Sequence, residues 1–245
     1  MKTSIRAVLF DLGNTLMYAP DPWPPVFTRA GQELADFLCE HAITVDCESF
    51  SSSFLQRLDE YYSDREHNLM ETTTLSLLKG LLAEQGHSVL PEALLRQALD
   101  EFYAVTEQNW RLEADALPTL AALQNSGFRL GLVSNAGDDP DVLQLVDHFG
   151  IGGFFDFILT SAACGYRKPH PRIFELALEN WNCMPDEIAM VGDRLDADIG
   201  GARPLGIYTI WIRRRSSETT LNSATPDAVV DTLLEIPSKL SLVSK

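Results

Sequence analysis

Three apolar stretches of the sequence each run directly into a polar residue that could do chemistry. The first ends in Asp11, the second in Ser134 and Asn135, and the third in Asp193. A carboxylate such as Asp11 can act as a nucleophile, as a metal ligand, or as both. It can also do no more than cap the turn that follows it. Asp11 alone therefore leaves the choice between chemistry and a turn open.

A lysine stands between the second and the third of these stretches. Lys168 precedes Pro169 in a loop segment that also contains Gly165 and His170. A single Lys-Pro pair is a weak indication of function, and so is a single Gly-Asp pair. Four such features in this order along one chain are a much more specific pattern, and they favour chemistry.

Buried parallel strands are expected to position these residues. Short apolar runs closed by turn residues are typical of strands covered on both faces. Such runs occupy residues 8–10, 128–135, 157–160, 188–193 and 207–212, and helical patterns over 117–125, 173–181 and 197–202 separate them. Strands that alternate with helices predict an α/β fold with a doubly wound parallel sheet and right-handed crossovers. The carboxyl ends of parallel strands meet at one edge, so we expect the polar residues to share a crevice.

Only helical patterns appear between the first strand and the rest of the sheet. Apolar residues recur at helical spacing over residues 26–38, 50–62, 75–82 and 94–105. The Pro-rich segment 18–25 predicts a stiff hinge in front of them. We therefore expect an all-helical cap of residues 18–112, inserted into an α/β core of residues 1–17 and 113–245.

The overall composition narrows the class of protein. The chain has 245 residues and a net charge of −16, which argues against a nucleic-acid-binding surface and against an anionic membrane face. No apolar run approaches the ~20 residues of a membrane span, and the N-terminal apolar stretch stops at Asp11, too early for a secretory signal. We expect a monomer or a homodimer without membrane or nucleic-acid partners.

The four cysteines show no paired spacing of the zinc or redox kind. They are scattered along the chain: Cys39, Cys47, Cys164 and Cys183. We interpret all four as reduced thiols, which favours a cytoplasmic protein.

The order and wording of the motifs resemble the haloacid dehalogenase superfamily. The segments that resemble its four motifs are Phe-Asp-Leu-Gly-Asn-Thr-Leu from Phe10, Leu-Val-Ser-Asn-Ala from Leu132, Arg-Lys-Pro-His-Pro-Arg-Ile-Phe from Arg167, and Val-Gly-Asp-Arg-Leu-Asp-Ala-Asp from Val191. The resemblance covers residues 5–16 and 117–234, whereas the helical insert matches only in position and type. The commonest members are magnesium-dependent phosphatases, so the resemblance implies a phosphatase that acts on a small phosphorylated metabolite.

The resemblance implies a nucleophile and a metal site. Asp11 would attack phosphorus and form an aspartyl-phosphate intermediate. Mg²⁺ would be held by Asp11, the backbone carbonyl of Gly13, and Asp193, with Asp198 in support. Hard oxygen ligands of this kind suit Mg²⁺, and the ion offsets the charge of carboxylate and phosphate together.

The resemblance also implies a phosphate-binding set. Ser134 would hydrogen-bond a phosphoryl oxygen, with Asn135 beside it in the substrate site. Lys168 would neutralise charge in the transition state and keep Asp11 ionised.

The first motif departs from the usual phosphatase pattern, Asp-x-Asp-Gly-Thr. Gly13 stands where the second Asp is expected, and Asn14 stands where the Gly is expected. The missing Asp protonates the leaving oxygen and later activates water, a contribution of ~10²–10⁴ in rate. Glycine cannot do this, although its carbonyl can still bind metal. Asn14 is plausible because Asn tolerates the left-handed conformation.

Four interpretations of this departure stay open. A slow phosphatase could act on good leaving groups, such as acyl phosphates or activated aryl esters. A substitute acid could come from Asp138 or Asp139, from the cap, or from the substrate. The protein could be a metal-independent 2-haloacid dehalogenase, whose attack on carbon needs no leaving-group acid. It could also be a weakly catalytic relative that binds a phosphometabolite or a protein.

A fifth interpretation is a phosphonatase, which lacks the same Asp and uses a cap lysine as a Schiff base. Both this interpretation and the dehalogenase one meet difficulties in the sequence. Dehalogenases of this superfamily lack the acidic pair of the fourth motif, which is present here as Asp193 and Asp198. A phosphonatase needs a cap lysine, and Lys79 lies in a Leu-rich helical stripe without a supporting motif.

The cap is expected to close over the site and to set specificity. Four of its aromatic residues could line a pocket or simply pack: Trp23, Tyr61, Tyr62 and Trp110.

Overall fold

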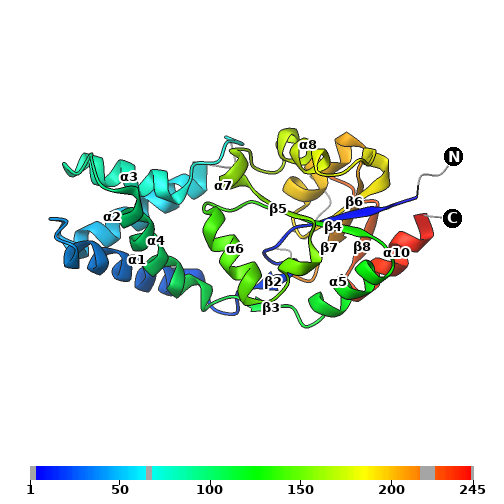
Figure 1. Cartoon of the computed structure of the whole chain (residues 1–245), viewed down its shortest axis with the longest axis horizontal. Helices are drawn as coiled ribbons and strands as arrows, with labels where there is room; N and C mark the ends of the chain where they lie inside the picture. Colours follow the sequence, from blue (N-terminus) through cyan, green and yellow to red (C-terminus); the bar gives the residue numbers. More distant parts are fainter. Residues whose placement is uncertain (1–3, 65–67, 216–223, 244–245) are drawn as a thin grey trace.

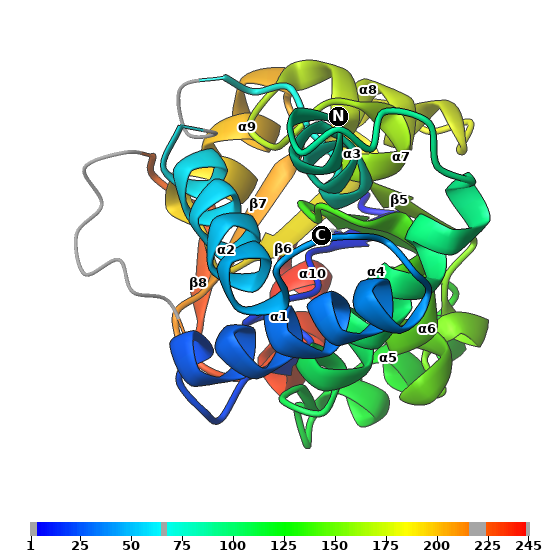
Figure 2. The ribbon, with the colours of Figure 1, turned by 90° about the vertical axis from the view of Figure 1, so that its left-hand side faces the viewer.

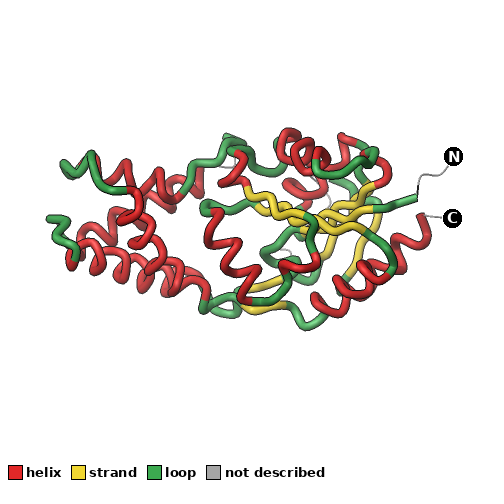
Figure 3. Tube along the Cα trace, in the orientation of Figure 1, coloured by secondary structure: helices red, strands yellow, loops and turns green. Residues whose placement is uncertain are grey.

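A computed structural model describes residues 4–64, 68–215 and 224–243. Six strands form one sheet in the order β5-β4-β1-β6-β7-β8, and every neighbouring pair is parallel. The strands are β1 (Ala7–Phe10), β4 (Arg129–Ser134), β5 (Phe157–Thr160), β6 (Ile188–Gly192), β7 (Tyr208–Ile212) and β8 (Ala228–Val230). Figure 3 shows the strands gathered in the core, with helices around them. The predicted α/β class with a doubly wound parallel sheet is confirmed.

Helices cover both faces of the sheet. Those on one face are α5 (Ala116–Asn125), α6 (Asp139–His148) and α10 (Ile236–Val243), and those on the other are α8 (Pro171–Glu179) and α9 (Gly200–Ala202). Short helices complete the core: α7 (Ser161–Cys164), a π-helical turn (Leu195–Ile199), and 3-10 turns at Gly152–Phe154, Pro185–Glu187, Arg203–Leu205 and Leu233–Glu235.

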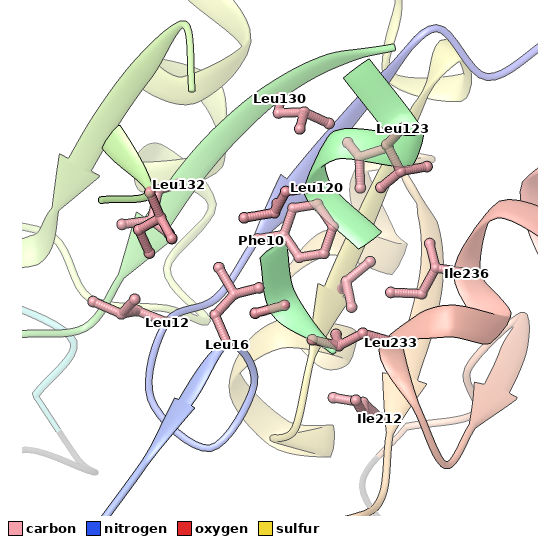
Figure 4. Packing of buried hydrophobic residues seen from close by; sticks show 14 of the residues in the cluster. Phe10, Leu12, Leu16, Leu120, Leu123, Leu130, Leu132, Ile212, Leu233 and Ile236 are labelled. Carbon is pink, nitrogen blue, oxygen red and sulfur yellow. The ribbon is translucent and has the colours of Figure 1, made fainter. Parts of the chain in front are cut away.

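The central strand β1 packs against both layers. Val8 and Phe10 belong to the cluster with α5, α6 and α10, and Ala7 and Leu9 belong to the cluster with α8. Figure 4 shows Phe10 among the leucines and isoleucines of the first cluster. All four residues of β1 are fully buried, which explains why its sequence is a continuous apolar run rather than an alternating one.

Four helices form a separate layer with its own apolar core. They are α1 (Trp23–Glu40), α2 (Cys47–Asp64), α3 (Thr74–Glu84) and α4 (Glu92–Glu107). Figure 1 places them at one end of the long axis, beyond the edge of the sheet, and Figure 2 shows this end facing the viewer. Phe54 and Phe102 meet edge to face within that core, with ring centroids 5.7 Å apart. We refer to the segment 18–112 as the cap.

A two-stranded ribbon joins the cap to the core. β2 (Met17–Tyr18) pairs antiparallel with β3 (Arg111–Leu112), so that Met17 lies opposite Leu112. The chain therefore leaves the core and returns to it through adjacent strands. The expected limits of the cap, residues 18 and 112, fall within this ribbon.

The predicted Pro-rich hinge is wrong over its last three residues. Helix α1 already begins at Trp23, so Pro24 and Pro25 lie in its first turn. The first N–H groups of a helix have no intrahelical acceptor, so proline loses nothing there.

The prediction of four reduced cysteines is also wrong. Cys39, at the end of α1, forms a disulfide with Cys47, at the start of α2, whereas Cys164 and Cys183 are free. The short connection between the two helices brings the pair together, although a separation of eight residues is no recognised redox motif. Because disulfides persist mainly in oxidising compartments, Cys39 and Cys47 no longer support a cytoplasmic location.

Among the described residues, no helix combines the length and the apolar character needed to cross a membrane.

Candidate active site

A cavity of about 440 Å³ lies between the carboxyl edge of the sheet and the cap. The ends of β1, β4 and β6 open into it, as the parallel topology requires. Every predicted site residue lines this cavity: Asp11, Gly13, Ser134, Asn135, Lys168, Asp193 and Asp198.

The carboxylate of Asp11 is held on both of its oxygens. Lys168 Nζ donates to Oδ1 at 2.6 Å, and Thr15 Oγ1 donates to Oδ2 at 3.3 Å. The backbone N–H of Asp11 continues the sheet by donating to Val191 at 2.9 Å. Only 8% of the residue is exposed, so the group is fixed and largely removed from water.

Lys168 is the cation of this cluster. Its Nζ donates to Asp11 and, at 2.7 Å, to the carbonyl of Val133, and it also lies 2.7 Å from Asp198 Oδ1. Burial alone would lower the pKa of Lys168, but the carboxylates of Asp11 and Asp198 more than offset this effect and raise the pKa. The ammonium group therefore stays charged although only 3% of the residue is exposed.

Asn135 positions the backbone of Lys168. Its Oδ1 accepts the N–H of Lys168 at 2.7 Å, and its Nδ2 donates to the carbonyl of Lys168 at 2.9 Å. The following peptide bond, Lys168–Pro169, is cis. Both ends of the amide are thus engaged, and the contribution of Asn135 to the site runs through Lys168.

Three buried carboxylates converge at the same point. Oxygen atoms of Asp11, Asp193 and Asp198 lie within 4.8 Å of one another. Burial, followed by the charges of Asp11 and Asp198, raises the pKa of Asp193 to about 8. Burial also raises the pKa of Asp198, to about 6, although Lys168 opposes the shift. This set of hard oxygen donors fits a divalent cation such as Mg²⁺, whose charge relieves the repulsion.

The glycine of the Gly-Asp pair is required by the position of Asp198. A Cβ atom on Gly192 would lie 2.2 Å from the carboxyl carbon of Asp198. Asp198 itself is held in the π-helical turn by the N–H of Arg194, which donates to Oδ2 at 3.0 Å. Single π turns of this kind are frequent at functional sites.

Gly13 is not imposed by the backbone. A Cβ atom there would meet only Trp110 Cη2, at an ordinary contact distance of 3.6 Å, and Gly13 is not among the residues with positive φ. The left-handed position is Asn14, with φ 57°, as predicted. Nothing in the backbone conformation or in the space around Gly13 therefore excludes an aspartate at this position.

The two expected substitute acids are already engaged. Asp138 caps α6 by accepting the N–H of Asp141 at 3.0 Å, and it pairs with Arg96 of the cap at 2.7 Å. Asp139 accepts from Thr160 Oγ1 at 2.6 Å and is not among the cavity-lining residues.

Sequence reasoning missed Asp141, which lines the cavity from the first turn of α6. Its Oδ1 is buried and has no hydrogen-bond partner within the described part of the chain. Burial, followed by the charges of Glu107 and Asp138, raises the pKa of Asp141 well above its usual range, against the effect of Arg96. Two of these facing groups come from α4, so Asp141 belongs to the cap end of the cavity.

The cap side of the cavity is an aromatic wall. Its members are Trp23, Phe27, Tyr62, Phe102, Tyr103 and Trp110. The rings contact one another, with centroid separations of 5.2 Å for Trp23 and Phe27 and of 5.1 Å for Trp23 and Trp110. Three of the four aromatic residues considered from the sequence thus line the cavity. The fourth, Tyr61, points elsewhere and donates to Glu71.

Glu71 fastens the cap to the core. Its buried carboxylate pairs with Arg167 and accepts from Ser161 and Tyr61. The cap lysine that a phosphonatase would need, Lys79, pairs instead with Glu92 on the exposed surface, outside the cavity lining.

Known proteins resemble the chain over most of its length. A family model described as haloacid dehalogenase-like hydrolase matches residues 5–206. A glyceraldehyde 3-phosphate phosphatase of Methanopyrus kandleri is 36% identical over 230 residues, which cover 93% of each chain. The structure of a 2-haloacid dehalogenase from Pseudomonas syringae pv. Tomato superposes with a TM-score of 0.67 at 26% identity, covering 97% of this chain and 99% of that one. A phosphatase structure from Thermococcus onnurineus shares the fold, with a TM-score of 0.64 at 24% identity and coverage of 96% and 98%. By the extent of the family match, this chain belongs to the haloacid dehalogenase-like hydrolases and is an enzyme.

Proposed function

We propose that the protein is a Mg²⁺-dependent phosphatase that acts on a small phosphorylated metabolite through an aspartyl-phosphate. One observation carries the proposal: oxygen atoms of Asp11, Asp193 and Asp198 converge within 4.8 Å, next to the buried ammonium of Lys168. A hydrolase that attacks carbon needs no such cation-binding set, whereas phosphoryl transfer needs concentrated positive charge.

Asp11 would act as the nucleophile. It lies at the end of β1, and its carboxylate is oriented by Lys168 and Thr15. Attack of a carboxylate oxygen on phosphorus breaks the ester bond and leaves the phosphoryl group on Asp11. Lys168 would stabilise the transferring charge, and the hydroxyl of Ser134 would donate to a phosphoryl oxygen.

The metal would be held by residues that follow two neighbouring strands, β1 and β6. Asp11, Asp193 and the backbone carbonyl of Gly13 would supply oxygen ligands, with Asp198 in support. The bound ion would neutralise part of the charge that the carboxylates and the phosphate bring together.

The glycine at position 13 predicts a low rate with ordinary alkyl esters. Without the second aspartate, no side chain of the first motif protonates the leaving oxygen, and general acid catalysis is worth ~10²–10⁴. Glyceraldehyde 3-phosphate, the substrate named for the Methanopyrus relative, is the first metabolite to test.

The decisive assay is phosphate release from 4-nitrophenyl phosphate, with Mg²⁺ and with EDTA. We expect metal-dependent release that Asp11→Asn lowers by at least about 10³-fold, because the covalent step is lost. Asp147→Asn, an exposed aspartate on α6, is the matched control and should leave the rate unchanged. Full activity in Asp11→Asn would refute the assignment of the nucleophile.

A 2-haloacid dehalogenase is the second candidate. Two observations favour it: Gly13 offers no acid, and a structure of that activity superposes at 26% identity. It predicts chloride release from 2-chloropropionate without metal and unchanged in Asp193→Asn. If neither phosphate nor chloride were released but the protein still bound phosphate, the result would indicate a relative that binds a phosphometabolite or a protein.

We infer the same partners and location as from the sequence: a small phosphorylated molecule, no nucleic acid, a monomer or homodimer, and the cytoplasm. The Cys39–Cys47 disulfide is the observation against this location. Thiol titration of freshly prepared protein, without and with denaturant, tests whether the bond forms in cells.

A further inference from the structure

We propose that the substrate is an aryl phosphate, in which a single aromatic ring carries the phosphate directly on its oxygen. The proposal rests on the phosphatase function proposed above and names the substrate class of the same site. Two independent features of the cavity carry it, one at the core end and one at the cap end.

The core end favours a leaving group that needs no proton. Gly13 supplies no acid in the first motif. The carboxylate of Asp138 pairs with Arg96 and accepts the N–H of Asp141 at the start of α6. Asp139 accepts a hydrogen bond from Thr160. A phenol has a pKa of about 10, like the tyrosine side chain. The pKa of an alkyl alcohol is several units higher, close to that of water. A phenolate can therefore leave unprotonated where an alkoxide cannot.

The cap end favours a flat apolar group. The aromatic wall lines the cap side of the cavity, and Trp110 reaches to within contact distance of the Cβ position of Gly13. The indole of Trp110 thus stands beside the atom that would carry the missing acid. A ring attached to the phosphate oxygen would lie against this wall, where offset or edge-to-face aromatic contacts are favourable.

The charges of the cavity disfavour a second anionic group. Within the described residues, each cation that lines the cavity already has a carboxylate partner: Arg167 with Glu71, Lys168 with Asp11 and Asp198, and Arg194 with Asp196. The cap end adds Asp138, whose charge is balanced by Arg96, and Asp141, so it offers no cation to a second phosphate or a carboxylate. The organic part is therefore uncharged, and the substrate carries one phosphate.

The covalent step balances without an acid. An oxygen of Asp11 forms a bond to phosphorus while the bond from phosphorus to the phenolic oxygen breaks. The electron pair of that bond stays on the phenolate, which takes its proton from water after it leaves. Water then attacks the aspartyl-phosphate at phosphorus, and it releases inorganic phosphate, the free carboxylate of Asp11 and a proton to solvent.

The test separates the ring from the leaving group with four substrates at saturating Mg²⁺. Phenyl phosphate has both a ring and a good leaving group, benzyl phosphate has the ring only, acetyl phosphate has the leaving group only, and glyceraldehyde 3-phosphate has neither. We expect kcat/KM for phenyl phosphate to exceed that for benzyl phosphate by about 10²–10⁴, the value of a missing general acid. We expect acetyl phosphate to be turned over with a KM at least about 3-fold higher than phenyl phosphate.

Three variants assign the two effects to residues. Gly13→Asp should lower the ratio of kcat/KM for phenyl phosphate to kcat/KM for benzyl phosphate by at least about tenfold, because it restores a leaving-group acid. Trp23→Leu should raise KM about 3- to 10-fold for phenyl phosphate and not for acetyl phosphate. Phe37→Leu is the matched control, since Phe37 lies on the same helix outside the cavity lining, stacked on His41. Asp141→Asn should leave the ratio of the two kcat/KM values, phenyl over benzyl phosphate, unchanged.

Each outcome decides between defined alternatives. Equal kcat/KM for phenyl and benzyl phosphate would overturn the proposal while leaving the phosphatase function intact, and a ratio that rises in Asp141→Asn would make Asp141 the missing acid. A KM for acetyl phosphate that equals or falls below that for phenyl phosphate would remove the role of the wall. No metal-dependent phosphate release from any of the four would overturn the phosphatase function itself.

Discussion

The two ends of the cavity are built on opposite principles. At the core end, Asp11, Lys168 and Asp198 hold one another at 2.6–2.7 Å in a buried cluster. At the cap end, aromatic rings pack on one another and leave a surface without a fixed cation among the described residues. The chemistry is therefore fixed by buried charges of the core, whereas the choice of substrate depends on the shape and polarity of a separate helical layer.

The two ends also differ in what a substitution costs. Removing one partner of a buried ion pair leaves an uncompensated charge, at about 3–5 kcal/mol. Removing one contact from an aromatic cluster costs about 0.5–1.5 kcal/mol beyond the area lost. Core substitutions should therefore damage folding and chemistry together, whereas cap substitutions should shift specificity alone.

Lys168→Met is expected to have the largest effect. It leaves the carboxylates of Asp11 and Asp198 buried without their cation, so the free energy of unfolding should fall by about 3–5 kcal/mol. Phosphate release should fall at least about 10²-fold with the loss of charge stabilisation. Urea denaturation and steady-state kinetics measure the two effects. Wild-type stability in this variant would show that the buried cluster is not what fixes the core end.

Gly192→Ala tests the core end without changing any charge. The added Cβ would lie 2.2 Å from the Asp198 carboxyl carbon, so we expect a loss of about 1–3 kcal/mol in unfolding free energy and weaker Mg²⁺ binding. The matched control is Gly153→Ala, whose Cβ meets nothing within 4 Å. Isothermal titration with Mg²⁺ and urea denaturation would follow both variants. Equal behaviour of the two would contradict the close approach of Asp198.

The raised pKa of Asp193 predicts a pH dependence of stability in the metal-free protein. Because the folded pKa is about 8 and the unfolded one is about 3.9, the folded state binds more protons between these values. Stability should then fall as the pH rises through this window, by at most about 1.4 kcal/mol per pH unit.

Thermal unfolding in EDTA from pH 5 to pH 8 measures the slope, and Asp193→Asn should flatten it. Mg²⁺ binds the deprotonated carboxylates, so its stabilising effect should grow with pH. The same slope in Asp193→Asn as in the wild type would assign the proton to another group.

Lys79→Met, on the exposed surface of the cap, should have the smallest effect. The pair with Glu92 is exposed, so unfolding free energy should change by less than about 0.5 kcal/mol. Turnover should stay at the wild-type value, measured with 4-nitrophenyl phosphate. A large loss of turnover would instead revive the phosphonatase interpretation.

The core end could be predicted from the sequence because its signals are local. An apolar run that stops at Asp11, Ser134 or Asp193 marks both a strand and the residue at its end. The topology then brings the ends together, since parallel strands share one edge. The left-handed position of Asn14 followed from residue type alone.

The features that were missed depend on contacts between distant segments. Strand β8 has three residues and β2 and β3 have two each, too short for a periodic pattern. The role of Asp141 appears only when α4 packs beside it, and the Glu71–Arg167 pair joins residues 96 positions apart. Nothing local in the sequence marks such pairs.

The ribbon of β2 and β3 determines how readily the segment between these two strands can be replaced during evolution. Met17 lies opposite Leu112, so the two ends of the inserted segment are adjacent. The path of the chain through the sheet would stay the same whatever segment lay between the two strands. Insertions with adjacent ends are the kind that folds tolerate best. The helical layer can therefore be replaced as a unit, so that a new substrate range would require no change in the catalytic residues of the core.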